Sequence, residues 1–188
     1  MKGAHTASDA IPGLDRTVGD FWSWAFSDLN QNTVRSLFAE YLVGSLLGVR
    51  SHGRTEWDAY DLLYRPVRIE VKSSAYVQSW HQDALSTPRF DIAPKRTFEE
   101  KTNRLVGPCE RHADVYVFAL YTEKDRATAN PLDVAGWRFW VVSTAALDAQ
   151  LGEQKSLGLG TLGRFTAPVA AAGLQVRVDA VARRGEAG

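Results

Sequence analysis

Residues 57–78 read W-D-A-Y-D-L-L-Y-R-P-V-R-I-E-V-K-S-S-A-Y-V-Q. Two strand-like runs, 61–64 and 67–73, flank Arg65-Pro66, where proline fixes φ and indicates a turn. If these two residues connect the strands, residue 64 pairs with 67, 63 with 68 and 62 with 69, and Asp61 faces Glu70. The stretch therefore predicts a β-hairpin around which the rest of the fold is arranged.

The hairpin gathers charged side chains on one face. Facing residues of an antiparallel pair share a face, and so do alternate residues of one strand, so Asp61, Glu70 and Lys72 project from the same side. Two close carboxylates raise each other's pKa unless a cation lies between them. Mg²⁺ suits them because it needs only one or two protein carboxylates. The alternative is a solvated charged face on an edge hairpin.

Asp61, eight intervening residues and Glu70-Val71-Lys72 resemble the PD-(D/E)xK signature of the restriction-endonuclease-like nuclease superfamily. The resemblance implies Mg²⁺ held by the two acids, a lysine that acts on the attacking water, and cleavage of phosphodiester bonds. It also implies catalytic roles for a glutamate on a preceding helix, Glu40, and for a glutamine after the lysine, Gln78. Tyr60 replaces the proline of the signature.

The first acid of the signature has two candidates. Asp58 differs from Asp61 by three positions, so it falls on the opposite face if the strand extends that far. We therefore expect Asp61, with Glu70 and Glu40, to hold the metal, which is Mg²⁺ or alternatively Mn²⁺.

The helices before the hairpin are indicated by apolar residues at helical spacing. Residues 15–30 predict a helix that packs in the core, with base stacking by Trp24 as a minor alternative. Residues 33–47, with Gly48 as the stop, predict a largely buried helix. A buried carboxylate is costly unless it is paired or metal-linked, so Glu40 on this helix is either a site residue or the partner of Arg35 or Arg68.

The later elements indicate strands interleaved with helices. Strands are expected at 89–92, 115–121, 137–142 and 174–178, and helices at 97–107, from a capping-box pattern, and from residue 143 or 144 to near Gly152. The run 115–121 is continuously apolar, which is typical of a central strand. The expected fold is α/β, a restriction-endonuclease-like three-layer core with a mixed central β-sheet flanked by helices. One domain, 15–180, is expected between a flexible N-terminus, 1–14, and a flexible tail, 181–188.

Composition bounds the partners and the compartment. The 22 basic and 22 acidic residues cancel, so no overall field indicates a nucleic-acid partner. A single cysteine forms no internal disulfide and is typical of a reducing cytoplasm. No apolar run is long enough to span a membrane, so no membrane partner is expected.

Local features suggest where DNA would contact the chain. The region from 95 to 111 is the most basic, and polar and aromatic groups follow the hairpin. The candidate contacts are Ser74, Trp80, Lys95, Arg96 and Arg104.

Two other motifs indicate no site. The run 158–163, G-L-G-T-L-G, matches a dinucleotide-binding fingerprint but is expected to be a turn, because Pro168 lies close behind it. Cys109 and His112 resemble half of a zinc site without a second pair.

The sequence thus predicts a Mg²⁺-dependent endonuclease that hydrolyses DNA. The alternatives are a catalytically weak or inactive nucleic-acid-binding or assembly module of the same fold, and a hydrolase for another phosphoester. A homodimer is also possible.

Overall fold

The predicted hairpin is present with the predicted register. The structure, a computed structural model, describes residues 4–49, 59–99 and 101–185. Strands β1 (Leu62–Tyr64) and β2 (Val67–Ala75) are antiparallel, with Leu62 opposite Ile69 and Tyr64 opposite Val67. Arg65 adopts a positive φ of 56° at the turn, and the fixed φ of Pro66 completes it.

The hairpin forms one edge of a mixed sheet with the strand order β1-β2-β6-β7. Strand β6 (Val115–Tyr121) runs parallel to β2, and β7 (Trp137–Ser143) runs antiparallel to β6. Every residue of β6 is buried, as its continuous apolar run predicts. The expected α/β class with a mixed central sheet is therefore confirmed.

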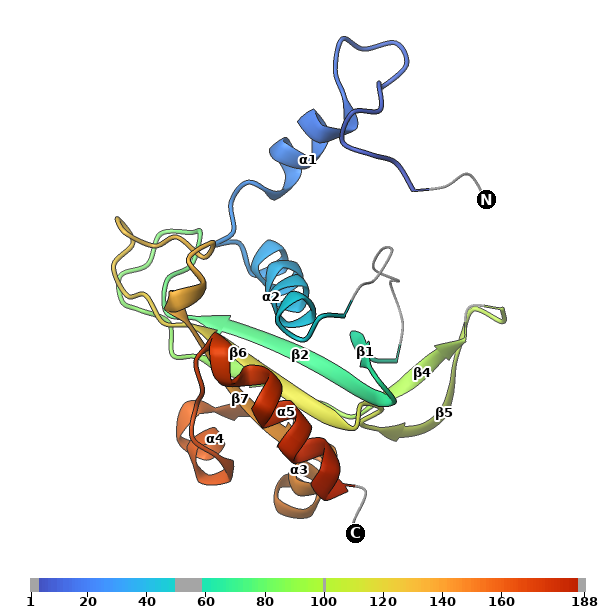
Figure 1. The fold of residues 1–188 in the computed structure, drawn as a ribbon, viewed down its shortest axis with the longest axis vertical. Helices are drawn as coiled ribbons and strands as arrows, with labels where there is room; N and C mark the ends of the chain where they lie inside the picture. Colours follow the sequence, from blue (N-terminus) through green and yellow to red (C-terminus); the bar gives the residue numbers. More distant parts are fainter. Residues whose placement is uncertain (1–3, 50–58, 100, 186–188) are drawn as a thin grey trace.

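Layers cover both faces of the sheet (Figure 1). On one face, α2 (Asn32–Leu46) and α5 (Ala171–Gly185) pack against Ile69, Val71 and the odd-numbered residues of β6. On the other face, the even-numbered residues of β6 pack against α3 (Thr144–Leu151), α4 (Leu159–Phe165) and a ribbon of β3 (Arg89–Asp91) with β8 (Ser156–Gly158). A short 3₁₀ turn, η1 (Val134–Gly136), precedes β7. No helix in the described part of the chain is both long enough and apolar enough to cross a membrane.

The helix predicted at 97–107 is wrong. Strands β4 (Lys95–Glu99) and β5 (Arg104–Glu110) form an antiparallel hairpin that projects from the body in Figure 1. The capping-box pattern at Thr97 is a local signal, whereas the pairing with β5 depends on residues that follow the turn. Asn103 adopts a positive φ of 53° at this turn, a conformation that asparagine tolerates better than most residues.

The strand predicted at 174–178 is also wrong, because these residues lie inside α5. Leu174 and Val178 are both fully buried and stand one helical turn apart, so they lie on the same face of the helix and pack on the sheet.

The glycine-rich run does not form the expected turn. Gly158 ends β8 and α4 begins at the next residue, with Leu162 fully buried. Pro168 lies beyond the end of α4 and does not interrupt it. Strand β8 pairs antiparallel with β3, so this glycine run is not part of a parallel βαβ unit.

The first helix occupies an unexpected environment. Helix α1 (Val18–Phe26) begins with a capping box between Thr17 and Asp20. Core packing was expected, yet no residue of α1 is buried, and Figure 1 shows the helix extending away from the sheet. The prediction of its packing is therefore wrong, although its helical conformation is confirmed.

Candidate active site

The site lies at the start of β1, where the pairing of β2 with β1 stops within the described residues. Strand β1 pairs with β2 only from Val67 to Ile69. Beyond Ile69, the side chain of Asp61, the residue before β1, pairs with the backbone of β2: its Oδ2 accepts a hydrogen bond from the Val71 N–H at 2.8 Å. One carboxylate oxygen thus satisfies a backbone donor that a longer β1 would have paired.

A cavity of about 310 Å³ opens at this edge. Helix α2 contributes Glu40, and the hairpin contributes Asp61 and Lys72, so three of the predicted catalytic residues line one space. The remaining lining residues are Ser36, Leu37, Val71, Ser73 and Asp91. The hydroxyls of Ser36 and Ser73, 3.0 Å apart, connect α2 to β2 beside the acids.

Glu70 faces a narrow cleft that adjoins this cavity. The cleft shares Lys72 and Asp91 with the cavity and also contains Lys95. Glu70 and Lys72 are neighbours on one face of β2, opposite the side of Ile69 and Val71 that packs in the core, as the alternation predicts. Lys72 therefore lines both spaces and contacts Glu70.

The two predicted metal-binding acids of the hairpin affect each other electrostatically. Burial, followed by the negative charge of Glu70, raises the pKa of Asp61 to about 6 from its ordinary 3.8. The hydrogen bond from Val71 and the charge of Lys72 oppose this rise, and Glu40 adds to it. Burial and Glu70 thus disfavour the ionised form of Asp61, and a cation bound beside it would favour that form.

Lys72 is a charged donor in this arrangement. Its Nζ lies 2.5 Å from Glu70 Oε1 in a largely buried ion pair. Burial alone would lower the pKa of Lys72, but the attraction of Glu70, its hydrogen bond and the charges of Asp61 and Asp91 outweigh burial and raise the pKa. Lys72 therefore keeps its proton at neutral pH, so it can stabilise negative charge but cannot accept a proton from water.

Asp91 is a site residue that sequence reasoning missed. It lies on β3, lines both the cavity and the cleft, and acts electrostatically on Lys72. Its Oδ1 accepts the Ala93 N–H at 3.1 Å. The sequence shows Asp91 between the apolar Phe90 and Ile92, but nothing in that alternation indicates that β3 lies beside β2.

Gln78 lies outside the cavity and the cleft. Its side chain is buried, accepts a hydrogen bond from Arg35 at 3.2 Å, and donates one to the Ala75 carbonyl at 3.0 Å. In this position Gln78 connects the start of α2 to the end of β2. Arg35, one of the expected partners of Glu40, is thus directed to Gln78.

The predicted DNA contacts fall into separate groups. Lys95 lines the cleft, and Arg96 and Arg104 are exposed on the β4–β5 hairpin. Ser74 is buried in β2, and Trp80 is half exposed in the loop after β2. Figure 1 places that loop and the β4–β5 hairpin at opposite ends of the sheet, so a single short duplex contact does not join all five residues.

The donor set fits a hard cation with few protein ligands. No group of three or more His, Cys, Asp or Glu side chains within the described residues is arranged to hold a metal ion. Asp61 and Glu70 are instead two carboxylates, the type and number of protein ligands that Mg²⁺ usually takes while it keeps most of its waters. Asp58, the alternative first acid, lies outside the described residues.

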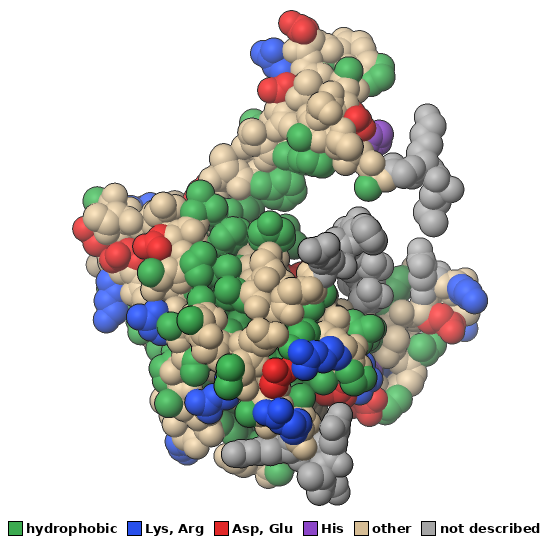
Figure 2. All heavy atoms as spheres, in the orientation of Figure 1, with side chains coloured by type: hydrophobic (Ala, Val, Ile, Leu, Met, Phe, Trp, Pro, Cys, Tyr) green, Lys and Arg blue, Asp and Glu red, His purple; other side chains and the backbone are tan. Residues whose placement is uncertain are grey.

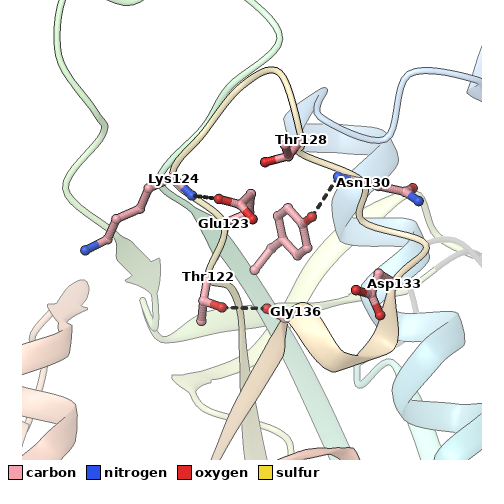
Figure 3. A pocket seen from close by; sticks show the side chains of 8 residues that line it. Thr122, Glu123, Lys124, Thr128, Asn130, Asp133 and Gly136 are labelled. Carbon is pink, nitrogen blue, oxygen red and sulfur yellow. Dashed lines mark hydrogen bonds between the residues drawn. The ribbon is translucent and has the colours of Figure 1, made fainter.

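A larger cavity, of about 420 Å³, lies at the carboxyl end of β6 (Figure 3). Its acids serve the loop: Glu123 accepts the N–H groups of Lys124 and Asp125, and Asp133 accepts the Ala135 N–H. In Figure 3 the side chain of Lys124 points away from the cavity. The acids of this cavity are thus engaged by the backbone of their own loop, and its lysine points away from it.

The comparisons with known proteins agree with an endonuclease. Residues 24–152, more than half of the chain, match the family model described as bacteriophage T4 endonuclease IV. The chain belongs to the bacteriophage T4 endonuclease IV family. The residues that match this endonuclease IV family model include α2, the hairpin and β3, and thus every described residue that lines the cavity. Neither the curated proteins nor the solved structures gave a match.

Proposed function

We propose that the chain is a Mg²⁺-dependent endonuclease that hydrolyses phosphodiester bonds of DNA, with the site at the open edge of β2. The observation that carries this proposal is the pair Asp61 and Glu70: burial, followed by the charge of Glu70, raises the pKa of Asp61 to about 6 beside the charged Lys72. Membership of an endonuclease family supports a nucleic-acid substrate.

The metal ion would be held by Asp61 and Glu70, with Glu40 at the rim of the cavity. Bound there, Mg²⁺ or Mn²⁺ supplies positive charge for the phosphate and makes a water molecule more acidic. The arrangement of acids, lysine and sheet edge supports assignment to the PD-(D/E)xK superfamily and its restriction-endonuclease-like fold.

Lys72 has the role of a charged hydrogen-bond donor. Hydrolysis of a phosphodiester adds a water oxygen to phosphorus and expels a sugar oxygen, and negative charge builds on the phosphoryl oxygens. A protonated amine next to the cavity stabilises that charge in the transition state more than in the ground state. Asp91 lines the same cavity and favours the charged form of this amine through its negative charge.

The DNA backbone would approach from the side of the β4–β5 hairpin. Lys95 at the cleft and the exposed Arg96 and Arg104 offer positive charge to phosphates, while Ser74 and Trp80 lie at the far end of β2. Gln78 would act by fixing the end of β2.

The second candidate is a nucleic-acid-binding module of the same fold with little or no turnover. The ion pair between Lys72 and Glu70 favours it, because an acid engaged by lysine holds a metal ion less tightly. The two candidates differ in whether DNA is cut.

The test is cleavage of supercoiled plasmid, linear duplex and single-stranded DNA, with RNA as a further substrate, in Mg²⁺, Mn²⁺ or EDTA. The wild type is compared with Asp61→Asn and Lys72→Gln, and with Lys124→Gln as a matched control outside the site. We expect metal-dependent cleavage that both site variants lose and the control keeps.

Retention of DNA in a gel shift without cleavage of any substrate would support the binding module instead. Cleavage that both site variants retain would refute the assignment of the active site to Asp61 and Lys72.

A further inference from the structure

The N-terminal part of the chain forms an arm, here residues 4–30, that stands apart from the sheet (Figure 1). Its helix α1 contains no buried residue, and its aromatic side chains reach the solvent: Phe21 is 49% exposed and Trp24 is 82% exposed. Figure 2 shows apolar side chains along this arm that continue at its base onto the body. A soluble monomer rarely leaves such a surface uncovered.

The pattern of α1 is that of a helix built to pack. Val18, Phe21, Trp22 and Ala25 recur at the spacing that places apolar residues on one helical face. The helix has nine residues, and isolated helices below ~12–15 residues are only marginally stable in water. Because the described part of the body does not bury this face, packing against another molecule would stabilise the helix.

The charge of the arm argues against nucleic acid as that molecule. The arm, residues 4–30, contains four acidic residues, Asp9, Asp15, Asp20 and Asp28, against one basic residue, Arg16. A net negative segment repels phosphates. The remaining residues, 31–188, hold 20 of the 22 basic and 18 of the 22 acidic side chains, so their net charge is positive. The arm and residues 31–188 therefore carry net charges of opposite sign.

We propose that the arm packs on the body of a second copy of this chain and forms a reciprocal, two-fold dimer. The acceptor is the outer face of α2, where Tyr41 is 71% exposed and its ring lies 6.4 Å from that of Phe38. This face follows the arm directly in the chain, so two copies that exchange arms bring two α1 helices and two α2 helices together.

The area available is enough for a stable dimer. With ~150–250 Å² for a large side chain, the exposed fractions of the aromatic residues of α1 amount to about 500 Å² per arm. Two arms and the surfaces that they cover would bury about 2,000 Å², which exceeds the ~1,600 Å² of a standard interface.

The experiment measures the mass of the full chain in solution by light scattering and sedimentation over a range of concentrations. We compare the wild type with the double variant Phe21→Ser/Trp22→Ser, and with Leu132→Ser, which removes a 62% exposed apolar side chain outside the arm. We expect a dimer whose dissociation constant rises ~100-fold or more in the double variant, since buried aromatic anchors dominate interfaces. We expect Leu132→Ser to leave the dissociation constant of the dimer unchanged.

Cross-linking tests the exchange itself. In a Cys109→Ser background, which removes the single native cysteine, one tagged protein carries Trp22→Cys and a differently tagged one carries Tyr41→Cys. Oxidation of the mixture gives a disulfide-linked hetero-pair if the arm lies on the partner's α2. A monomeric wild type at high concentration, a dimer indifferent to Phe21→Ser/Trp22→Ser, or the absence of the hetero-pair would each overturn the proposal.

Discussion

Replacing Asp61 by asparagine removes one negative charge from the site and keeps an oxygen that can accept the Val71 N–H. The pKa of Asp61 is raised to about 6 from 3.8, mainly by burial and by Glu70. At ~1.4 kcal/mol per pKa unit, this difference corresponds to an ionisation penalty of about 3 kcal/mol in the folded state. Relaxation and salt reduce it, so we expect Asp61→Asn to raise the free energy of unfolding by about 1–3 kcal/mol at pH 7.5 without metal.

The sign of the pH dependence follows from the raised pKa. Between pH 3.8 and about 6 the folded protein holds a proton on Asp61 that the unfolded chain has lost, so the wild type loses stability as pH rises through this window. Below the window Asp61 is protonated in both states and its penalty disappears. The advantage of Asp61→Asn should therefore be small near pH 4 and complete above about pH 7.

Urea denaturation followed by tryptophan fluorescence at pH 4.5 and 7.5, in EDTA, measures this difference. Asp83→Asn is the control, because the side chain of Asp83 is fully exposed and its neutralisation should change little. Addition of Mg²⁺ at pH 7.5 should then stabilise the wild type more than the variant. An Asp61→Asn protein that is less stable than the wild type at pH 7.5, or equally favoured at both pH values, would refute the reasoning.

Three further outcomes are expected. Because the pKa of Lys72 is raised, its amine stays protonated up to pH 9, so the rate of DNA cleavage should not fall below that pH through deprotonation of this lysine. Lys72→Gln should lower kcat ~100-fold or more, while the affinity for DNA stays within a few-fold of the wild type. Arg96→Ala/Arg104→Ala should weaken DNA binding in a salt titration and make the dependence of log affinity on log salt less steep by about 1–2; an unchanged slope would remove the hairpin from the interface. In a urea titration, Gly136→Ala should lower the free energy of unfolding by about 1–3 kcal/mol, because a Cβ there would lie 2.6 Å from an aromatic ring. Gly163→Ala is the matched comparison: its Cβ meets open space inside α4, so it should raise the free energy of unfolding by about 0.5–1 kcal/mol.

Short-range chemistry explains which parts of the fold could be predicted from the sequence. The hairpin register follows from Arg65-Pro66, because a two-residue turn leaves only one pairing. Strand β6 was predicted at its observed bounds because a strand buried on both faces reads as an unbroken apolar run. The start of α3 follows from Ser143, whose hydroxyl accepts the Ala146 N–H.

The wrong predictions arise where distant residues decide the structure. Thr97 begins a pattern that would cap a helix, but pairing with β5 gives its backbone another partner. Residues 174–178, L-Q-V-R-V, alternate apolar and polar side chains as a strand does, yet the buried Leu174 and Val178 are four residues apart, which also suits a helix that packs on the sheet. Helix α1 was expected in the core because apolar spacing does not reveal which surface will cover it.

The candidate site was predictable only in part for the same reason. The acids and lysine of the hairpin share a strand register, and Glu40 was suggested by its apolar helix. Asp91 comes from β3, whose place beside β2 depends on tertiary packing, so no local signal assigned it. The engagement of Gln78 by Arg35 is likewise a contact between distant segments.

The short β1 also has a consequence for how this protein behaves when crowded with copies of itself. An unpaired strand edge is a template for aggregation, and natural sheets protect such edges with inward-pointing charges. Asp61 covers the Val71 N–H with a carboxylate, so an incoming foreign strand would have to displace a hydrogen bond and bury a negative charge. We therefore expect substitutions that neutralise Asp61 to lower the barrier to edge-to-edge pairing in concentrated solution, even where they raise thermodynamic stability.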